Sequence, residues 1–349
     1  ELMKRHSILL AALCALLLMV PGESRAASVY KLSMTTLYPT THPTCANVWL
    51  PWIRQINRET NGRVVINYFD PNTICPNNEM YASVVSGAVD IAGHLCGATP
   101  GKFPSMEAPA LPLLVESALA GSLTVWDFYD REEQAKKDFR DVKILWMWSS
   151  ADFHIQTISR PVRTLEDIRG LKLICWTQDN AELCKALGGI PINIPTQDTY
   201  LALQRGMADG LLTPIASMRS YKTSEVCTYT TMCSLMVNPI WMAMNKTRWN
   251  SLPDDIKAVF EKNSGRVMAH ASGKSLDDGS MLDYTYLAEK EGKVFYILPA
   301  EERARWQEAV RPLHEKWLKK MAGAFDAEQL RKDVLDISSR NAQDAPRRY

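Results

Sequence analysis

The stretch from Trp176 to Asn180 carries side chains that could bind a small molecule. Trp176 follows a short apolar run, and Gln178 and Asp179 come next, at the start of a predicted helix. The Asp179 carboxylate could accept a ligand ammonium, while the Trp176 ring would add a cation–π contact. The alternative is that residues 178–180 only cap the helix.

Further aromatic side chains follow or end other predicted strands and could line the same cleft: Trp148, Phe153 and Trp241. An indole buries a large area and keeps one N–H for a polar contact. Trp146 and Trp148 are two residues apart on a predicted strand, so they share one face. The alternative for this pair is therefore a place in the core.

Three histidines, His42, His94 and His154, lie near predicted strand ends. A single histidine is more often a hydrogen-bonded structural group than a ligand contact. A protonated imidazole can nevertheless hold a ligand carboxylate, with a strength that depends on pH. Thr36 and Thr213 stand at the ends of predicted strands and could donate a hydroxyl hydrogen to a ligand.

Seven cysteines follow residue 26, and an exported chain can form disulfides. Three pairs are candidates, and seven is odd, so at least one thiol should be free or intermolecular. The first pair flanks a predicted hairpin turn, the second joins a strand end to the next helix, and the third joins two strand ends: Cys227 with Cys233, Cys175 with Cys184, and Cys45 with Cys75.

Metal binding and catalysis are the two alternatives to simple ligand binding. A soft metal could bind to residues of the first half of the chain, namely His42, Cys45, Cys75, His94 and Cys96. Their spacing matches no zinc pattern, so we expect no metal and no cofactor. The sequence contains no Gly-x-Ser-x-Gly, His-Glu-x-x-His or phosphate-loop motif. The enzymatic alternative is a secreted Cys/His enzyme, for example Cys96 with His154, which needs a thiol of lowered pKa.

The elements that must position these residues alternate between strand and helix. Residues 143–148, 155–159, 171–175, 191–194 and 210–213 are predicted strands, with helices at 164–170, 179–187 and 199–206. Thr164 and Asp167 have the spacing of a capping box. This alternation predicts an α/β fold with a parallel or mixed sheet and a ligand at the strands' carboxyl ends.

The rest of the chain adds strands before and after this stretch and helices at the end. Predicted strands are 29–35, 63–69, 89–93, 223–227, 229–234, 240–245 and 293–298. From residue 254 to about 338 the pattern is otherwise helical. The charged run at 301–320 predicts a solvated helix face.

The first 26 residues have the pattern of a secretory signal peptide. A basic start is followed by an apolar run at 7–20, which is short for a membrane span, and by small residues at Ser24 and Ala26. Cleavage after Ala26 would place the protein in the periplasm. The net charge is +1, so nothing favours nucleic acid as a partner.

Four motifs occur in an order that resembles the solute-binding proteins of TRAP transporters, the DctP-like family. They are Ser86-Gly-Ala-Val-Asp-Ile91, Leu165-Glu-Asp-Ile-Arg-Gly-Leu-Lys172, Leu201-Ala-Leu-Gln-Arg-Gly-Met-Ala-Asp-Gly210 and Met244-Asn-Lys-Thr-Arg-Trp-Asn-Ser-Leu-Pro253. The resemblance implies a two-lobed periplasmic binding protein fold with mixed sheets and long crossing helices. It implies closure on one small molecule, membrane permease subunits as partners, and no catalysis.

With this resemblance we divide the chain into a signal peptide (1–26), a first lobe (27–150), a second lobe (151–245) and C-terminal helices across both lobes (246–349). We expect a monomer. The division remains an expectation from the resemblance and from the element pattern.

Three positions depart from the family pattern. Family members usually carry an arginine that clamps a ligand carboxylate, and Ile174 occupies its place, with Trp176 in place of a proline. His154 stands where a second arginine is common, so we expect it to be the exception among the histidines and to contact the ligand. Leu211 and Leu212 replace a polar residue. The resemblance with these departures predicts an aromatic or partly apolar organic acid or amino acid as ligand.

Two alternatives remain, one for the ligand and one for the role of the protein. A small amine held by Trp176 and Asp179 is the second choice of ligand. A sensing subunit that docks on a receptor would use the same pair of lobes, and the sequence does not separate it from a transport protein.

Overall fold

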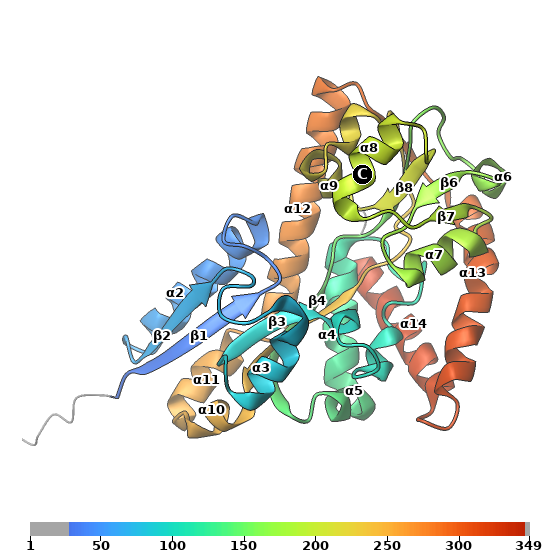
Figure 1. The fold of residues 1–349 in the computed structure, drawn as a ribbon. Helices are drawn as coiled ribbons and strands as arrows, with labels where there is room; N and C mark the ends of the chain where they lie inside the picture. Colours follow the sequence, from blue (N-terminus) through green and yellow to red (C-terminus); the bar gives the residue numbers. More distant parts are fainter. Residues whose placement is uncertain (1–27, 346–349) are drawn as a thin grey trace, which may run out of the picture.

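The computed structural model describes residues 28–345. These residues form two lobes, each built around one β-sheet (Figure 1). Sheet A, in the first lobe, has the order β2-β1-β3-β10-β4. β1, β2 and β3 are parallel, and β10 runs antiparallel to both of its neighbours. The strands of sheet A are β1 (Tyr30–Thr36), β2 (Val64–Phe69), β3 (Ile91–Leu95), β4 (Val142–Ser149) and β10 (Pro239–Asn245).

Sheet B, in the second lobe, has the order β11-β9-β5-β8-β6-β7. β6 is parallel to β7 and β8, whereas β5 is antiparallel to β8 and β9, so this sheet is mixed. Its strands are β5 (His154–Thr157), β6 (Lys172–Ile174), β7 (Ile190–Ile192), β8 (Gly210–Thr213), β9 (Tyr229–Met232) and β11 (Val294–Ile297).

The central strands of sheet A are buried on both faces. Every residue of β10 is buried, and alternate side chains enter different core clusters. Trp241 and Ala243 face the helices α3 (Met80–Ser86), α4 (Ala118–Arg131) and α14 (Ala327–Asp344). Ile240, Met242 and Met244 face α2 (Leu50–Glu59) and α11 (Asp254–Lys262). A strand covered on both faces reads as a continuous apolar run, which is what the sequence shows here.

Two extended segments, 150–153 and 233–238, join the sheets, and together we call them the crossing ribbon. The first leads from β4 to β5 and the second from β9 to β10. They hydrogen-bond to each other: Ser150 N–H donates to Asn238 C=O over 2.9 Å and Leu235 N–H to Phe153 C=O over 2.8 Å. The β10 strand, which falls in the segment expected to form the second lobe, thereby returns to sheet A.

Short helices cover the sheets. The helices and helical turns of the first lobe are η1 (Cys45–Trp49), α2 (Leu50–Glu59), η2 (Asn77–Glu79), α3 (Met80–Ser86), η3 (Cys96–Ala98), η4 (Pro104–Glu107), α4 (Ala118–Arg131), α5 (Glu133–Asp138), α10 (Lys246–Ser251) and α11 (Asp254–Lys262). Those of the second lobe are α6 (Leu165–Ile168), α7 (Gln178–Ala186), η5 (Thr196–Asp198), α8 (Thr199–Gln204), α9 (Ala216–Ser220) and η6 (Thr223–Glu225). The predicted capping box of Thr164 and Asp167 is present at α6.

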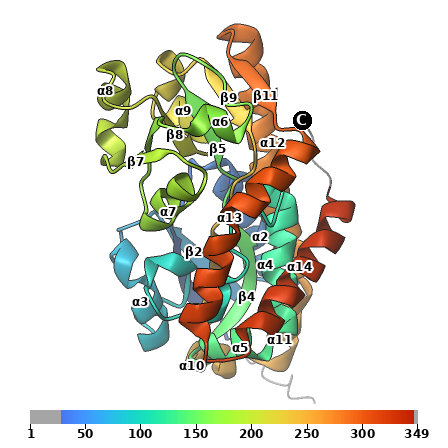
Figure 2. The same ribbon diagram turned by 90° about the vertical axis from the view of Figure 1, so that its right-hand side faces the viewer.

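Long helices connect the two lobes. α12 (Arg266–Lys290) packs on α4 and β4 in the first lobe and reaches α9 in the second, where Arg219 pairs with Asp283 over 2.7 Å. α13 (Ala300–Met321) buries Trp306 in the second lobe and Trp317 in the first. α14 (Ala327–Asp344) lies against α4 (Figure 2).

The structure confirms the predicted α/β fold with two lobes, mixed sheets and long crossing helices. Two local predictions are wrong. Residues 223–227 begin with the helical turn η6 rather than a strand. The charged run at 301–320 is not only a solvated face, because Glu302 and Arg303 are buried.

The predicted signal peptide lies outside the described residues. Within residues 28–345, no helix has both the length and the apolar character needed to span a membrane.

Candidate functional site

The predicted ligand residues come from two sheet edges that the crossing ribbon joins. Thr36 ends β1, and His94 near the end of β3 lies opposite Trp241 of β10. In sheet B, His154 at the start of β5 lies opposite Thr213 at the end of β8. Trp176 follows β6, which is parallel to β8, so it belongs to the same edge as Thr213. The ribbon leaves one edge after Ser149 and reaches the other at His154.

Trp176 is the aromatic residue of this edge of sheet B. It is half-buried, donates its indole N–H to the Thr199 hydroxyl over 3.1 Å, and meets the ring of Tyr221 edge-on at 5.3 Å. Ile174, two residues earlier, is 0 % exposed. The end of β6 therefore presents an indole at the surface and no charge.

The residues after Trp176 start α7. The helix is capped by Thr177, whose hydroxyl accepts the Asn180 N–H, and not by Gln178 or Asp179. Gln178 is exposed and bonds to Glu182, and Asp179 is exposed at the first turn. A ligand contact by either residue stays a prediction.

Two threonines at the sheet edges differ in their partners. Thr36 shares a 2.6 Å hydrogen bond with the Tyr68 hydroxyl. Thr213 is fully buried, and its hydroxyl has no hydrogen-bond partner among residues 28–345. An unpaired buried hydroxyl is destabilising, and Thr213 shares this state with Thr35, one residue before the end of β1.

The edge of sheet A carries an aromatic stack that the sequence analysis did not single out. The Tyr38 and His42 rings stack at 3.8 Å, and Tyr38 stacks on Trp49 at 5.5 Å. Burial lowers the pKa of His42 to about 4 and raises the pKa of Tyr38, so both rings are uncharged near neutral pH. Pro43, beside His42 at the start of the following helix, was the available sequence signal.

Three of the predicted aromatic residues contact the core in this conformation. Trp148 is fully buried and meets Trp49 edge-on at 5.1 Å, and Trp241 is fully buried against Tyr81. Phe153 packs in the core of the second lobe. Trp146 and Trp148 therefore lie in the core, as the alternative interpretation predicted. The burial of Trp148, Trp241 and Phe153 lends no support to a ligand role for them. His94 is half-buried and its Nδ1 accepts the Leu95 N–H over 2.9 Å.

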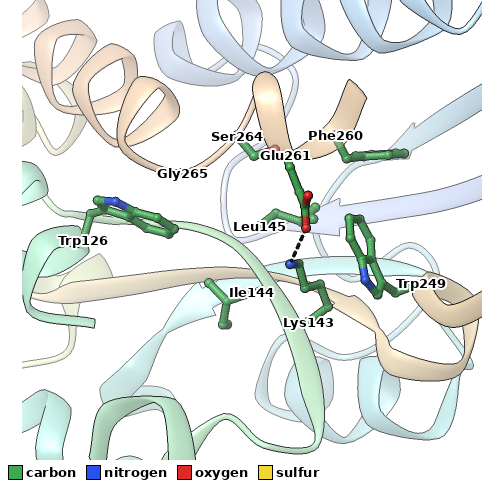
Figure 3. A pocket seen from close by; sticks show the side chains of 9 residues that line it. All are labelled: Trp126, Lys143, Ile144, Leu145, Trp249, Phe260, Glu261, Ser264 and Gly265. Carbon is green, nitrogen blue, oxygen red and sulfur yellow. Dashed lines mark hydrogen bonds and ion pairs between the residues drawn. The ribbon is translucent and has the colours of Figure 1, made fainter. Parts of the chain in front are cut away.

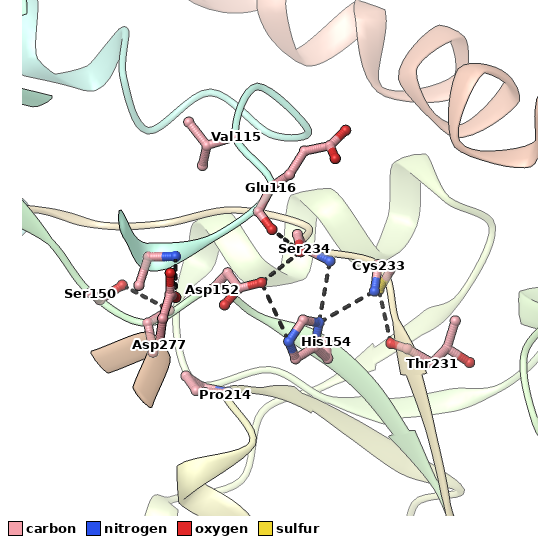
Figure 4. Close-up of polar contacts among 12 residues, drawn as sticks. Val115, Glu116, Ser150, Asp152, His154, Pro214, Thr231, Cys233, Ser234 and Asp277 are labelled. Carbon is pink, nitrogen blue, oxygen red and sulfur yellow. Dashed lines mark hydrogen bonds and ion pairs between the residues drawn. The ribbon is translucent and has the colours of Figure 1, made fainter. Parts of the chain in front are cut away.

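His154 lies inside a polar cluster at the crossing ribbon (Figure 4). Its Nδ1 accepts the backbone N–H groups of Cys233 and Ser234 over 3.3 and 3.2 Å, and its Nε2 lies 3.4 Å from Asp152 Oδ2. The Ser234 hydroxyl donates to the same carboxylate over 2.6 Å. Both ring nitrogens are thus engaged within the protein, and a ligand contact by His154 stays a prediction.

Arg303 of α13 is a buried charge that the sequence analysis placed on a solvated face. It donates to the carbonyls of Cys233 and Val115 over 2.5 and 3.1 Å and pairs with Glu116 over 3.1 Å. Through these contacts α13 is bonded to the crossing ribbon and to the loop before α4. A charge run cannot reveal which one of its members turns inward.

None of the predicted disulfides is formed among the seven described cysteines, all of which are buried. Cys227 and Cys233 flank the strand β9 rather than a hairpin turn, so an extended segment separates them. Cys45 and Cys75 lie in separate core clusters. Cys175 and Cys184 are the one predicted pair that shares a core cluster, and the interaction between the two thiols raises the pKa of Cys175 and lowers that of Cys184.

The alternatives of a metal site and an enzyme receive no support from the described residues. Within residues 28–345, no three His, Cys, Asp or Glu side chains come together as metal ligands would. Of the candidate ligands, Cys75 and Cys96 lie in one core cluster and Cys45 in another. Burial raises the pKa of Cys96, which is the opposite of what a nucleophilic thiol requires.

A hollow of about 180 Å³ lies elsewhere, where β4 begins (Figure 3). It is lined by Trp126, Trp249 and Phe260, and Lys143 pairs there with Glu261 over 3.1 Å. Because Lys143 and Trp148 are at opposite ends of β4, this hollow is not part of the two edges described above.

The matches to known proteins agree with this arrangement. Residues 34–320 match the family described as bacterial extracellular solute-binding protein, family 7 (DctP). The chain is 25% identical over 261 residues to the C4-dicarboxylate-binding periplasmic protein DctP of Rhodobacter capsulatus, covering 74% of this chain and 77% of the relative.

Two solved structures are similar over nearly their whole length. A TRAP periplasmic solute-binding protein from Desulfovibrio salexigens, in an open complex, is 28% identical with a TM-score of 0.83, covering 90% of this chain and 97% of that one. A marine metagenome TRAP solute-binding protein specific for aromatic acids, in complex with 3-hydroxybenzoate, is 25% identical with a TM-score of 0.77, covering 90% and 99%.

Members of this family are periplasmic, bind small molecules and work with membrane permease components. They are transport proteins and not enzymes. With a family match over residues 34–320 and the two-lobed fold on which it rests, this chain belongs to the DctP family of TRAP transporter solute-binding proteins.

Proposed function

We propose that this protein binds a small aromatic carboxylate between its two lobes and delivers it to a TRAP-type permease by lobe closure. One observation carries the choice of ligand. The end of β6 offers the buried Ile174 and the half-exposed Trp176 where the family resemblance implies an arginine and a proline.

The choice of ligand follows from two differences: the arginine that the family resemblance implies is absent, and the aromatic ring of Trp176 is present. A bidentate arginine–carboxylate pair is among the stronger polar contacts in proteins, and a ligand with two carboxylates depends on it most. A packed aromatic pair contributes about 0.5–1.5 kcal/mol beyond the area that it buries. A ligand with one ring and one carboxylate is therefore favoured over a C4 dicarboxylate.

The second sheet edge supports the same class of ligand. Tyr38 and His42 stack at the end of β1, and both are uncharged near neutral pH.

The edge of sheet B adds a polar group, because the unpaired hydroxyl of Thr213 is a donor available to a carboxylate oxygen. The marine metagenome relative, which is specific for aromatic acids, lends further support.

A small amine is the second candidate. The observation that favours it is the exposed Asp179 carboxylate, three residues after Trp176 at the start of α7. A ligand ammonium between this carboxylate and the indole face would form an ion pair with the first and a cation–π contact with the second. A role in sensing instead of transport would use the same site.

The test is native mass spectrometry of protein purified without refolding, followed by calorimetric titration with 3-hydroxybenzoate, benzoate, succinate, glucuronate and phenethylamine. We expect a bound aromatic acid and binding of the first two compounds only. Tight binding of succinate with no binding of either benzoate would overturn the proposal, and binding of phenethylamine alone would establish the amine alternative.

A pair of variants localises the ligand. Trp176→Ala should weaken 3-hydroxybenzoate binding at least tenfold, and Trp176→Phe should retain most of the affinity, because a phenyl ring keeps the aromatic face. Tyr286→Ala, at an exposed ring on α12, is the matched control. Equal affinities for the Trp176→Ala variant and the control would remove Trp176 from the site.

A further inference from the structure

The hollow at the start of β4 has no part in the proposed function (Figure 3). Segments far apart in the sequence line it: α4, the first residues of β4, α10, the end of α11 and the turn that leads into α12. Its volume is about 180 Å³. The first lobe alone therefore builds this space, and no residue of sheet B contributes to it.

Three aromatic rings form the apolar sides of the hollow. Figure 3 shows the Trp126 ring on one side and the Trp249 and Phe260 rings on the other. Phe260 is fully buried, meets Trp249 edge-on at 6.1 Å and also meets Trp52 edge-on at 5.9 Å. These contacts with the core hold the Trp249 and Phe260 rings in place, so a ligand would meet a surface that is already formed.

A glycine in the turn between α11 and α12 leaves room beside Trp126. Gly265 has a φ of +64°, and a Cβ on it would lie 3.0 Å from Trp126 Cζ2. Its N–H donates to the Leu145 carbonyl over 2.8 Å, which holds the turn against β4. A residue with a side chain at this position would be strained and would crowd the indole. The turn therefore lines the hollow with backbone.

An ion pair supplies the charged groups of the hollow. Lys143 Nζ lies 3.1 Å from Glu261 Oε1 and 4.5 Å from the centre of the Trp249 ring. Both side chains are partly exposed, and an ion pair of this kind contributes little to stability, so it can rearrange around a ligand at small cost. A hydroxyl group accepts a hydrogen bond from an ammonium and donates one to a carboxylate, so it suits both partners at once.

The size of the hollow restricts the ligand to a small ring. An apolar cavity of about 150 Å³ holds one benzene molecule. The hollow, at about 180 Å³, therefore has room for a benzene ring with a small substituent. A carboxylate substituent is disfavoured, because it would compete with Glu261 for Lys143 and be repelled by the Glu261 charge.

We propose that this hollow is a second binding site of the protein, and that its ligand is an uncharged phenol. The ring lies between Trp126 and the pair formed by Trp249 and Phe260, and the hydroxyl bonds to Lys143 and Glu261. This site is separate from the sheet edges assigned to the aromatic acid, because Lys143 and Trp148 are at opposite ends of β4. The proposal does not depend on the ligand of those edges.

Titration of the protein with 4-fluorophenol, followed by fluorine NMR, tests the proposal. We expect saturable binding that is at least about tenfold weaker in Trp126→Ala, because one aromatic side of the hollow is lost, and mostly retained in Trp126→Phe. Trp176→Ala should bind 4-fluorophenol as the wild type does. Circular dichroism checks that each variant is folded.

Two results would overturn the proposal. One is the absence of saturable binding of 4-fluorophenol to the wild type. The other is binding that Trp176→Ala loses and Trp126→Ala keeps, since the phenol would then occupy the sheet edges. Failure of 3-hydroxybenzoate to bind any form of the protein would count against the proposed function alone, because the phenol titration does not use that ligand.

Glu261→Gln tests the choice of a phenol over an acid. In the Trp176→Ala background, 4-fluorobenzoate should bind at least about tenfold more weakly than 4-fluorophenol. Adding Glu261→Gln frees Lys143 and removes the repulsion, so the affinity for 4-fluorobenzoate should rise about tenfold, whereas a disturbed fold would weaken both compounds. Glu308→Gln, at an exposed carboxylate on α13, is the matched control and should change neither affinity. Equal binding of the two compounds in the Trp176→Ala background would contradict the assignment of a phenol.

Discussion

Tyr38 and His42 stack face to face, with ring centroids 3.8 Å apart and planes 5° from parallel, at the carboxyl edge of sheet A. The His42 Nδ1 also accepts the Thr44 N–H over 3.2 Å, which fixes the ring at the start of the helical segment 45–59. The stack therefore places flat, uncharged rings at this edge of the first lobe.

The depressed pKa of His42 leads to a pH-dependent stability. The folded state holds its proton only below about pH 4, whereas the unfolded chain takes it up at about pH 6.5. The unfolded state therefore binds more protons between these values, and stability is lost as the pH falls, by up to about 3 kcal/mol. Urea unfolding of the wild type and of His42→Phe at pH 7.5 and pH 5 should show a smaller loss in the variant.

The control for this measurement is His270→Phe, which changes an exposed histidine on α12. Its loss of stability between the two pH values should equal that of the wild type. If His42→Phe behaves in the same way, His42 is not the group that titrates.

Thr213→Val should separate ligand binding from stability. The Thr213 hydroxyl is buried and has no partner in the part of the chain described here, so replacing it with a methyl group should leave the free energy of unfolding unchanged or slightly increased. Affinity for 3-hydroxybenzoate should fall about five- to tenfold, because one hydrogen bond to the ligand is lost. Calorimetric titration and urea unfolding measure the two effects.

Thr231→Val is the matched comparison. The Thr231 hydroxyl is also buried but donates to the Val162 carbonyl over 2.6 Å. Its loss leaves that carbonyl without this donor, so unfolding should become easier by about 1–2 kcal/mol with little change in affinity. Equal destabilisation by both variants would contradict the assignment of Thr213 as a ligand donor.

Arg303→Met should destabilise the protein by roughly 3 kcal/mol, because the backbone carbonyls of the ribbon and of the loop before α4 lose a buried charged donor. Arg311→Met, on an exposed part of the same helix, removes only surface ion pairs and should change stability by less than about 0.5 kcal/mol. Denaturant unfolding compares the two variants. Similar values for both would show that burial of Arg303 contributes little.

The seven described thiols should be unreactive in the folded protein and reactive once it is unfolded. All are buried, so a bulky maleimide should label them slowly in the native state and label all seven in guanidinium. Because the Cys175 and Cys184 thiols contact each other, oxidised glutathione should join this pair before any other. Peptide mapping that finds another disulfide in protein purified without reductant would contradict the structure.

The alternation of strands and helices predicted the α/β class, and the family resemblance implied the two lobes and the long crossing helices. The strand at 210–213 was predicted with its observed bounds, since it begins at a glycine and a proline follows it. The sheet that receives β10 was not predictable, because an apolar run that is buried on both faces fits the middle of either sheet. Residues 223–227 looked extended, yet Lys222 adopts a left-handed conformation and a helical turn follows.

The candidate site was predictable only where it follows strands. Trp176 and Thr213 were placed at one edge because the carboxyl ends of parallel strands share an edge. Tyr38 and Arg303 were missed for a different reason. The place of Tyr38 is set by a loop, and Arg303 is buried by contacts with segments about 70 and 190 residues away, which no local pattern encodes.

The position of β10 between β3 and β4 bears on how the chain is assembled. As the chain is made, the strand at 142–149 has no neighbour within its own sheet until residues 239–245 have been added, by which time five strands of sheet B already exist. The first lobe therefore cannot be completed from the first half of the chain. A fragment ending at residue 150 should be unfolded and prone to aggregate, and no single cut separates the protein into two pieces that each fold.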